Sequence, residues 1–265
     1  MREYFWKLQK YDGQATRFRC PSCGKSRQYT RFVNSDGQHA DFEFGKCNRE
    51  EKCGYYRPPN GIMSTAPKFE YKPEIIEFID WSEYNYNLDT GSEFVKTLIG
   101  LFGREKVLDT LKKYYVRTEE NSMLYPYIDE KNRLTYVKKM AYKGVNRKGG
   151  IYTPYKAKKG RFKQCLFGLH LVNQQRQNCV VESEKTALIC DIFYPKYTWL
   201  ATGGLGMISK IKVLDCATVF ADKGKAFIDW SDKLDATKYS MNTKIEESDL
   251  EDSEDLADLI LRDLK

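Results

Sequence analysis

The sequence has no long apolar run. We find no stretch of about 18 or more apolar residues, the length that a membrane-spanning helix needs. The first residues, Met1 to Lys7, also lack the apolar core of a secretory signal peptide. We therefore expect a cytoplasmic protein without a membrane partner, in which cysteines stay reduced and serve as metal ligands or core residues.

Acidic residues are missing from residues 131–163, which hold twelve lysines and arginines. The net charge of the whole chain is only +7, because residues 246–265 carry nine acidic and two basic residues. This division indicates a polyanionic partner, most simply nucleic acid, although a solvated face with a solubilising tail remains the alternative. The cations that we select as nucleic-acid ligands are Lys138, Lys139, Lys143, Arg147, Lys156, Lys158, Lys159, Arg161 and Lys163.

Aromatic side chains are interleaved with these cations. Rings of this kind can stack on the bases of single-stranded DNA while lysines and arginines follow the phosphates. The same rings could equally be core residues of strands, and we expect this of about half of them. The rings are those of Tyr136, Tyr142, Tyr152, Tyr155 and Phe162.

Four of the eight cysteines form two closely spaced pairs. Cys20 and Cys23 are separated by two residues, and Cys47 and Cys53 by five, with 23 residues between the pairs. Two pairs on tight turns supply the four soft ligands that tetrahedral Zn(II) prefers, and they leave no open position for catalysis. The sequence therefore predicts a structural zinc site, with His39 as a possible substitute ligand.

The remainder of the chain alternates between helical and strand patterns. Helical spacing covers residues 94–111, and a hairpin is expected around the turn at residues 129–132. Further on, short apolar strands at 179–181, 197–201 and 218–221 are joined by a helix at 185–193 and a connector. This order predicts a parallel sheet, and the fold class is α/β, or α+β for the whole chain.

Carboxylates follow two of these predicted strands. Glu182 comes directly after the strand at 179–181, and Asp222 directly after the strand at 218–221. Ligands collect at the carboxyl ends of parallel strands, and Mg(II) prefers carboxylates together with waters and phosphates. The pair is a candidate Mg(II) site, although acids also commonly end strands for structural reasons.

Several motifs together resemble the bacterial-type DNA primases, in the short form found in phages and mobile elements. The cysteine pairs resemble the primase zinc-binding domain. The segment from Met123 to Thr135 resembles the strand–turn–strand that opens the primase core, and Cys165-Leu-Phe-Gly-Leu169 resembles the segment before its TOPRIM fold. Val180-Val-Glu-Ser-Glu-Lys-Thr-Ala-Leu188 resembles the first TOPRIM motif.

The resemblance implies roles for individual residues. Glu182 matches a glutamate that acts as an acid/base or metal-site residue, and Asp222 matches the first aspartate of a magnesium-binding Asp-x-Asp pair. The second aspartate of that pair falls on Gly224, and a common aspartate of the following helix falls on Thr186. Asp229 is the nearest carboxylate that could compensate as a third catalytic residue.

The resemblance also implies a domain order and an activity. We expect a zinc ribbon at 1–60, a linker and helical segment at 61–118, a basic first part of the primase-like core at 119–165, a TOPRIM domain at 166–245 and an acidic tail at 246–265. The implied function is synthesis of a short RNA primer on single-stranded DNA from nucleoside triphosphates, with Mg(II) or Mn(II). A separate helicase or replication protein is an expected partner. The alternative is a non-catalytic DNA-binding accessory protein of replication or mobilisation.

Overall fold

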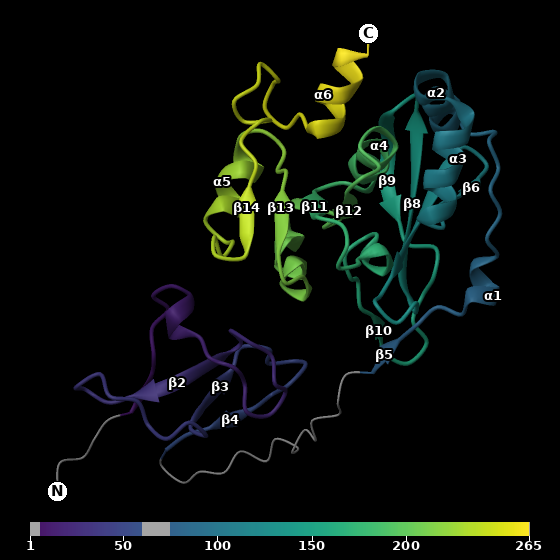
Figure 1. Ribbon diagram of the computed structural model, residues 1–265. Helices are drawn as coiled ribbons and strands as arrows, with labels where there is room; N and C mark the ends of the chain where they lie inside the picture. Colours follow the sequence, from purple (N-terminus) through teal and green to yellow (C-terminus); the bar gives the residue numbers. More distant parts are fainter. Residues whose placement is uncertain (1–5, 60–74, 265) are drawn as a thin grey trace, which may run out of the picture. The chain divides into compact units, whose positions relative to one another are not determined.

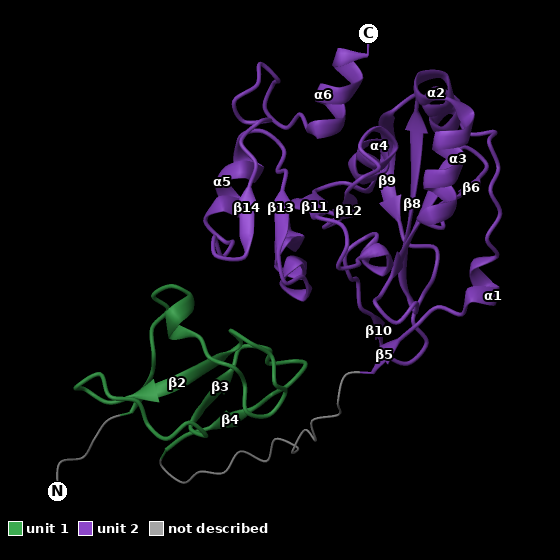
Figure 2. Cartoon of the chain, viewed as in Figure 1, with its two compact units in different colours: residues 1–74 green, residues 75–265 purple. Residues whose placement is uncertain are grey.

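The computed structural model describes residues 6–59 and 75–264. It divides the chain into two units, residues 1–74 and 75–265, which Figure 2 distinguishes by colour. The linker expected from residue 61 onward lies outside the described residues as far as residue 74. None of the described helices is long and apolar enough to cross a bilayer.

The first unit is a small antiparallel sheet with the order β1-β2-β3-β4. The strands are β1 (Lys7–Leu8), β2 (Tyr29–Val33), β3 (Gly45–Cys47) and β4 (Tyr56–Arg57), and a short 3-10 turn, η1, covers Gln14–Thr16. Its main buried cluster is small and consists of the fully buried Tyr29 and three buried cysteines, while Phe32, Val33 and Ala40 are also buried. A core of this size stabilises a domain only weakly, so we expect the unit to depend on the predicted zinc site.

The second unit begins with an antiparallel sheet of order β6-β7-β8-β9. Its strands are β6 (Arg117–Glu119), β7 (Ser122–Ile128), β8 (Leu134–Lys143) and β9 (Asn146–Tyr152), and helices α2 (Glu93–Phe102) and α3 (Arg104–Lys113) pack near them (Figure 1). The predicted hairpin is confirmed, since the Asp129 carboxylate accepts hydrogen bonds from the backbone N–H groups of Lys131 and Arg133. Helix α2 is capped by Ser92, whose hydroxyl accepts from the N–H of Val95.

A parallel sheet follows, as the strand and helix pattern predicted. Its order is β12-β11-β13-β14, formed by β11 (Asn178–Val181), β12 (Thr198–Ala201), β13 (Ala217–Val219) and β14 (Tyr239–Met241). Every neighbouring pair in this sheet is parallel. Helix α4 (Glu184–Phe193) joins β11 to β12 and is capped by Ser183, whose hydroxyl accepts from the N–H of Thr186. A 3-10 segment, η3 (Leu205–Val213), and α5 (Lys225–Ser231) complete the connections.

The acidic C-terminal segment is part of the second unit's core. Helix α6 (Leu256–Asp263) packs against α4, and its residues Leu256, Ala257 and Ile260 belong to the same buried cluster as α2, α3 and β7. The helix is amphipathic, since its leucines and Ile260 are buried whereas Arg262 and Asp263 are exposed. The residues that we had described as an acidic tail therefore contribute to folding.

Short elements complete the second unit at its other end. Strand β5 (Ile76–Glu77) pairs in parallel with β10 (Arg161–Phe162). Helix α1 (Trp81–Tyr84) follows β5, and most of the basic segment precedes β10. A 3-10 turn, η2 (Leu169–Leu171), leads into β11. The mixed α/β class with an N-terminal zinc ribbon is confirmed.

Candidate metal sites and nucleic-acid surface

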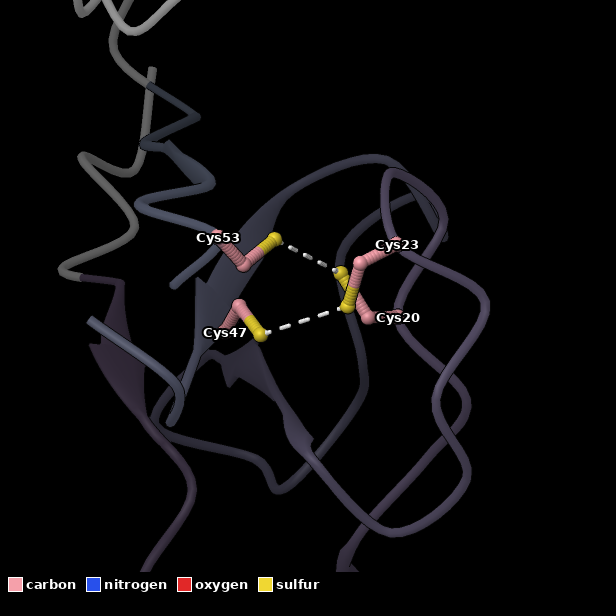
Figure 3. Close-up of side chains that lie close together, drawn as sticks. All are labelled: Cys20, Cys23, Cys47 and Cys53. Carbon is pink, nitrogen blue, oxygen red and sulfur yellow. Dashed lines mark hydrogen bonds between the residues drawn. The ribbon is translucent and has the colours of Figure 1, made fainter. Parts of the chain in front are cut away.

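The four paired cysteines converge on one point of the first unit. The sulfur atoms of Cys20, Cys23, Cys47 and Cys53 all lie within 4.8 Å of one another. Figure 3 shows the four side chains pointing toward a common centre. Two of the separations are 3.8 Å (Cys20–Cys53) and 3.9 Å (Cys23–Cys47). Sulfurs at the corners of a tetrahedron with Zn–S bonds of about 2.3 Å are separated by about 3.8 Å. The donor set and its spacing therefore fit Zn(II).

Two tight turns hold these sulfurs in place. The N–H of Gly24 donates to the carbonyl of Cys20, and the N–H of Cys53 donates to the carbonyl of Arg49. Burial raises the pKa of the Cys23 thiol, but the backbone N–H of Lys25 and the neighbouring cysteines outweigh it and lower the pKa to about 7. His39 hydrogen-bonds Gln9 instead and is not part of the cluster. Four cysteine ligands close the site, so its role is structural.

Glu182 and Asp222 lie at the carboxyl ends of neighbouring strands. β11 and β13 are paired in parallel, and the N–H of Phe220 donates to the carbonyl of Val180, which brings the two strand ends side by side. Burial raises the pKa of Asp222 to about 8, and the negative charges of Asp255 and Glu182 add to the effect. Burial also raises the pKa of Glu182, assisted by the charges of Asp255 and Glu184. The expected pair is therefore close in space.

Asp255 is a third carboxylate of this group, and the sequence reasoning missed it. It is the N-cap of α6, where its side chain accepts from the N–H groups of Ala257 and Asp258, and it also accepts from the Thr186 hydroxyl at 2.5 Å. The spacing Asp255-x-x-Asp258 before an apolar run is a capping-box pattern, and it was the signal that could have located this helix end. By composition alone, Asp255 falls within the predicted acidic tail.

A lysine lies among these clustered carboxylates, which do not form a compact metal-binding site. The Lys185 ammonium lies 3.8 Å from carboxylate oxygens of both Asp255 and Asp258. Among the described residues, only the cysteines form a group of three or more metal-ligating atoms within 4.8 Å of one another. The described carboxylates at this sheet edge therefore form an open, partly neutralised group and not a closed metal-binding cluster.

Gly224 and Asp229 occupy the start and the middle of α5. Gly224 has φ 79° and ψ −116°, and its N–H donates to the Glu246 carboxylate at 2.9 Å. The Asp229 carboxylate lies 3.6 Å from the ammonium of Lys233, which follows the end of the helix. The charges that act most strongly on Asp222 are those of Asp255, Glu182, Lys185 and Asp258, and Asp229 is not among them. A catalytic role for Asp229 stays a prediction.

A buried polar network supports the loop that follows β12. Glu184 accepts from the Tyr127 hydroxyl and lies 2.8 Å from the Lys138 ammonium, which donates to the Gly203 carbonyl at 2.6 Å. The Lys210 ammonium donates to the neighbouring carbonyl of Thr202. Burial lowers the pKa of Lys210 to about 8, with a contribution from the positive charge of Lys138. Lys138, which the sequence analysis selects as a nucleic-acid ligand, is thus buried and forms an internal ion pair with Glu184.

The other selected cations lie nearer the surface. Lys139 is partly buried and lies 2.8 Å from the Glu119 carboxylate. The side chains of β9 are exposed along the whole strand, including Tyr152 at 72% exposure, whereas Tyr142 is 98% buried. Of the selected cations, those classed as exposed are Lys143, Arg147, Lys156, Lys158, Lys159, Arg161 and Lys163.

A cavity of about 590 Å³ lies beside this surface. Its lining combines the hairpin turn after β7, the end of the basic segment and η3. Four cations face it, and Asp129 and Glu130 supply the opposite charge. The cations are Arg133, Lys163, Lys210 and Lys212. A concave site with several cations suits a polyphosphate ligand.

Comparisons with known proteins give two family matches and a set of similar structures. Residues 4–68 match a family described as a zinc beta-ribbon finger, and residues 92–222 match a domain of unknown function, DUF6371. The curated proteins searched include no match to the chain.

The similar structures are primase fragments at low sequence identity. The primase fragment of the bacteriophage T7 primase–helicase is 18% identical, with 94% of this chain and 95% of that chain covered and a TM-score of 0.46. The Escherichia coli primase catalytic core is 13% identical, with 68% and 67% covered and a TM-score of 0.37. A DNA primase domain from Pseudomonas aeruginosa is 14% identical, with 62% and 58% covered and a TM-score of 0.38.

Proposed function

We propose that this protein is a metal-dependent nucleotidyltransferase of the primase type, which binds single-stranded DNA and joins nucleotides into a short RNA. The observation that carries the proposal is the approach of Glu182, Asp222 and Asp255 at one edge of a parallel sheet. These residues come from three distant parts of the sequence. Burial and the charges of Asp255 and Glu182 raise the pKa of Asp222, and carboxyl groups with a pKa raised in this way concentrate at functional sites.

The carboxylates are suited to hold a divalent cation. Glu182 and Asp222 would be its protein ligands, with Asp255 acting directly or through a water, and Mg(II) or Mn(II) would supply charge neutralisation at the reacting phosphate. The Lys185 ammonium balances part of the negative charge when the cation is absent. Through Lys138 and Lys210, the network under residues 202–204 keeps the adjoining loop fixed.

The basic surface would hold the template and the incoming nucleotide. The cavity lined by Arg133, Lys163 and Lys210 has the charge for a nucleoside triphosphate. The exposed cations near β9, with Tyr152 among them, suit a single strand, because phosphates pair with cations and bases stack on rings. The zinc ribbon would provide a second contact with the template. Unwinding of duplex DNA is assigned to a separate helicase.

A non-catalytic DNA-binding role is the second candidate. Gly224 stands where the resemblance places a second aspartate, which removes one oxygen ligand and one negative charge from the site. If this role is correct, the carboxylates serve only to anchor α6 and Lys185. The zinc ribbon and the basic surface would then be sufficient for function.

Primer synthesis on single-stranded DNA separates the two candidates. The assay would use the full chain, the four ribonucleoside triphosphates and either Mg(II) or Mn(II). We expect short RNA products from the wild type, and a loss of about a hundredfold from Glu182→Ala, the upper end of what mutation of groups around a metal typically costs. Glu105→Ala on the exposed start of α3 is the matched control and should keep full activity. Wild-type protein that binds the template but makes no product with either metal would support the binding role.

A further inference from the structure

Glu77 is held by three successive backbone N–H groups. Its carboxylate accepts from the N–H of Lys158 at 2.9 Å, from the N–H of Lys159 at 2.6 Å, and from the N–H of Gly160. Glu77 and these donors are more than 80 residues apart in the sequence. Consecutive N–H groups directed at one point form a concave anion-binding site, the arrangement that binds phosphate in many proteins.

The pairing of β5 with β10 builds this concave loop. Arg161 is in register with Ile76, and the N–H of Arg161 donates to the carbonyl of Ile75 at 3.0 Å. Gly160 is required here, because a Cβ atom at that position would collide with the Ile75 carbonyl oxygen. The donors are therefore fixed by backbone contacts (Figure 1 shows the two strands together).

The segment that carries the loop is basic. Lys156, Lys158 and Lys159 are all exposed, and no acid occurs between residues 131 and 163. The bonds from the loop hold the pKa of Glu77 below its ordinary value, so the carboxylate is an anion at neutral pH. A carboxylate and a phosphate group accept the same N–H bonds, and both are attracted by the same lysines.

We propose that the loop Lys158–Gly160 is a phosphate-binding site for the backbone of single-stranded nucleic acid, and that Glu77 occupies it until a strand displaces the carboxylate. This inference rests on the proposed function, since it adds a phosphate contact to the surface that binds the template. Glu77 acts as an internal competitor that weakens binding of strands that make too few other contacts. Free triphosphate is the other source of the same chemical group.

Oligonucleotide binding by Glu77→Gln tests the proposal. Glutamine keeps an oxygen acceptor for the loop but removes the charge that competes with phosphate. We expect full-length Glu77→Gln to bind a fluorescent oligo-dT about fivefold more tightly than wild type at low salt, with a log–log salt slope steeper by about 0.7 for one added phosphate contact. Glu105→Gln changes the net charge equally at a distant exposed glutamate and should gain much less.

A second variant keeps the test decisive if glutamine also changes the loop. Adding Gly160→Ala to Glu77→Gln should abolish the gain, because the extra Cβ displaces the N–H groups. Equal affinity and equal slope for Glu77→Gln and Glu105→Gln would overturn the proposal. ATP that competes with oligo-dT more effectively in Glu77→Gln than in Glu105→Gln would assign the loop to free triphosphate and overturn the backbone assignment.

The test also separates this inference from the proposed function. Binding is measured without synthesis, so a protein that binds as expected but makes no RNA contradicts only the catalytic role. If Glu77→Gln and Glu105→Gln bind oligo-dT with equal affinity while the wild type makes RNA, only the role of the loop is contradicted.

Discussion

Asp222 shows how strongly a single residue depends on the groups around it. It is mostly buried, and the charges of Asp255 and Glu182 add to the effect of burial in raising its pKa to about 8. Without a divalent cation, this carboxyl is therefore largely protonated at pH 7. A bound cation would reverse the balance and favour the carboxylate, because it supplies the missing positive charge.

The raised pKa predicts a pH-dependent stability in the Mg(II)-free protein. A carboxyl whose pKa is raised by folding stabilises the folded state below about pH 4, and this contribution is lost as the pH rises through about 8. We expect the Tm of zinc-loaded wild type to fall over this range and to recover at pH 8 when Mg(II) is added. Asp222→Asn should show a flatter profile and little response to Mg(II). If the Tm of wild type and of Asp222→Asn changed with pH in the same way, the raised pKa would not belong to Asp222.

Gly224→Asp restores the aspartate implied by the resemblance, but it should not restore a good site. The backbone at Gly224, with φ 79° and ψ −116°, is poorly accessible to residues with a side chain, and Glu246 and Asp252 lie close by. We expect a loss of about 1–3 kcal/mol in the free energy of unfolding. Urea denaturation measures it, with Lys225→Asp, the next and exposed position, as the control. A stable Gly224→Asp protein with higher Mg(II)-supported synthesis would contradict this prediction.

The sequence located some site residues and missed others for a physical reason. Glu182 and Asp222 could be paired because neighbouring parallel strands end at the same edge. Asp255 could not be placed, because its position depends on α6 packing against α4 and on a bond to Thr186. Lys138 looked like its basic neighbours in the sequence, although its side chain turns inward to Glu184.

Among the secondary-structure elements, α6 departs most from what its composition suggests. Its acidic residues indicated a solubilising tail, yet Leu256, Ile260 and Leu261 are buried in the main core. The helix also positions Asp255 beside the carboxylate group. Deleting the segment would therefore remove core packing together with charge, so it is unsuitable as a test of electrostatic competition with nucleic acid.

Truncation of one core side chain of α6 tests this structural role. Ile260→Ala should lower the free energy of unfolding by about 2–5 kcal/mol, since Ile260 is 97% buried. Leu264→Ala, at a position with 40% exposure just after the helix, should change it by less than about 0.5 kcal/mol. Chemical denaturation followed by far-UV circular dichroism gives both values. Equal, small effects would mean that α6 is not packed in solution.

The two cysteine turns and their sheet should depend on zinc as a unit. Structural zinc contributes on the order of 10 kcal/mol to a small domain, and this domain has little other core. We expect about one zinc per chain by elemental analysis, and Cys47→Ser should lose it and expose residues 6–59 to protease while the second unit stays resistant. Cys216→Ser, at an exposed cysteine outside the cluster, is the control and should keep its zinc. Zinc-free but protease-resistant wild type would refute the site.

At the scale of the whole molecule, the chain combines a metal-dependent ribbon with a larger unit that carries the carboxylates and the basic surface. The order of these parts could be predicted, because cysteine spacing, strand alternation and charge are local patterns. The joining of α2, α3, β7, α4 and α6 in one core could not, since it depends on contacts between distant segments. The predicted boundaries at residues 118 and 165 fall inside this common unit.

Binding of Mn(II) tests most directly whether the sheet edge is a cation site. Titration of zinc-loaded full-length protein, followed by electron paramagnetic resonance, should reveal a Mn(II) site in the wild type that Mg(II) displaces. Glu182→Gln and Asp222→Asn should each weaken it at least tenfold, as loss of a ligand commonly does, whereas Asp109→Asn on the exposed side of α3 should not. Unchanged Mn(II) affinity in both Glu182→Gln and Asp222→Asn would contradict the catalytic site that we propose.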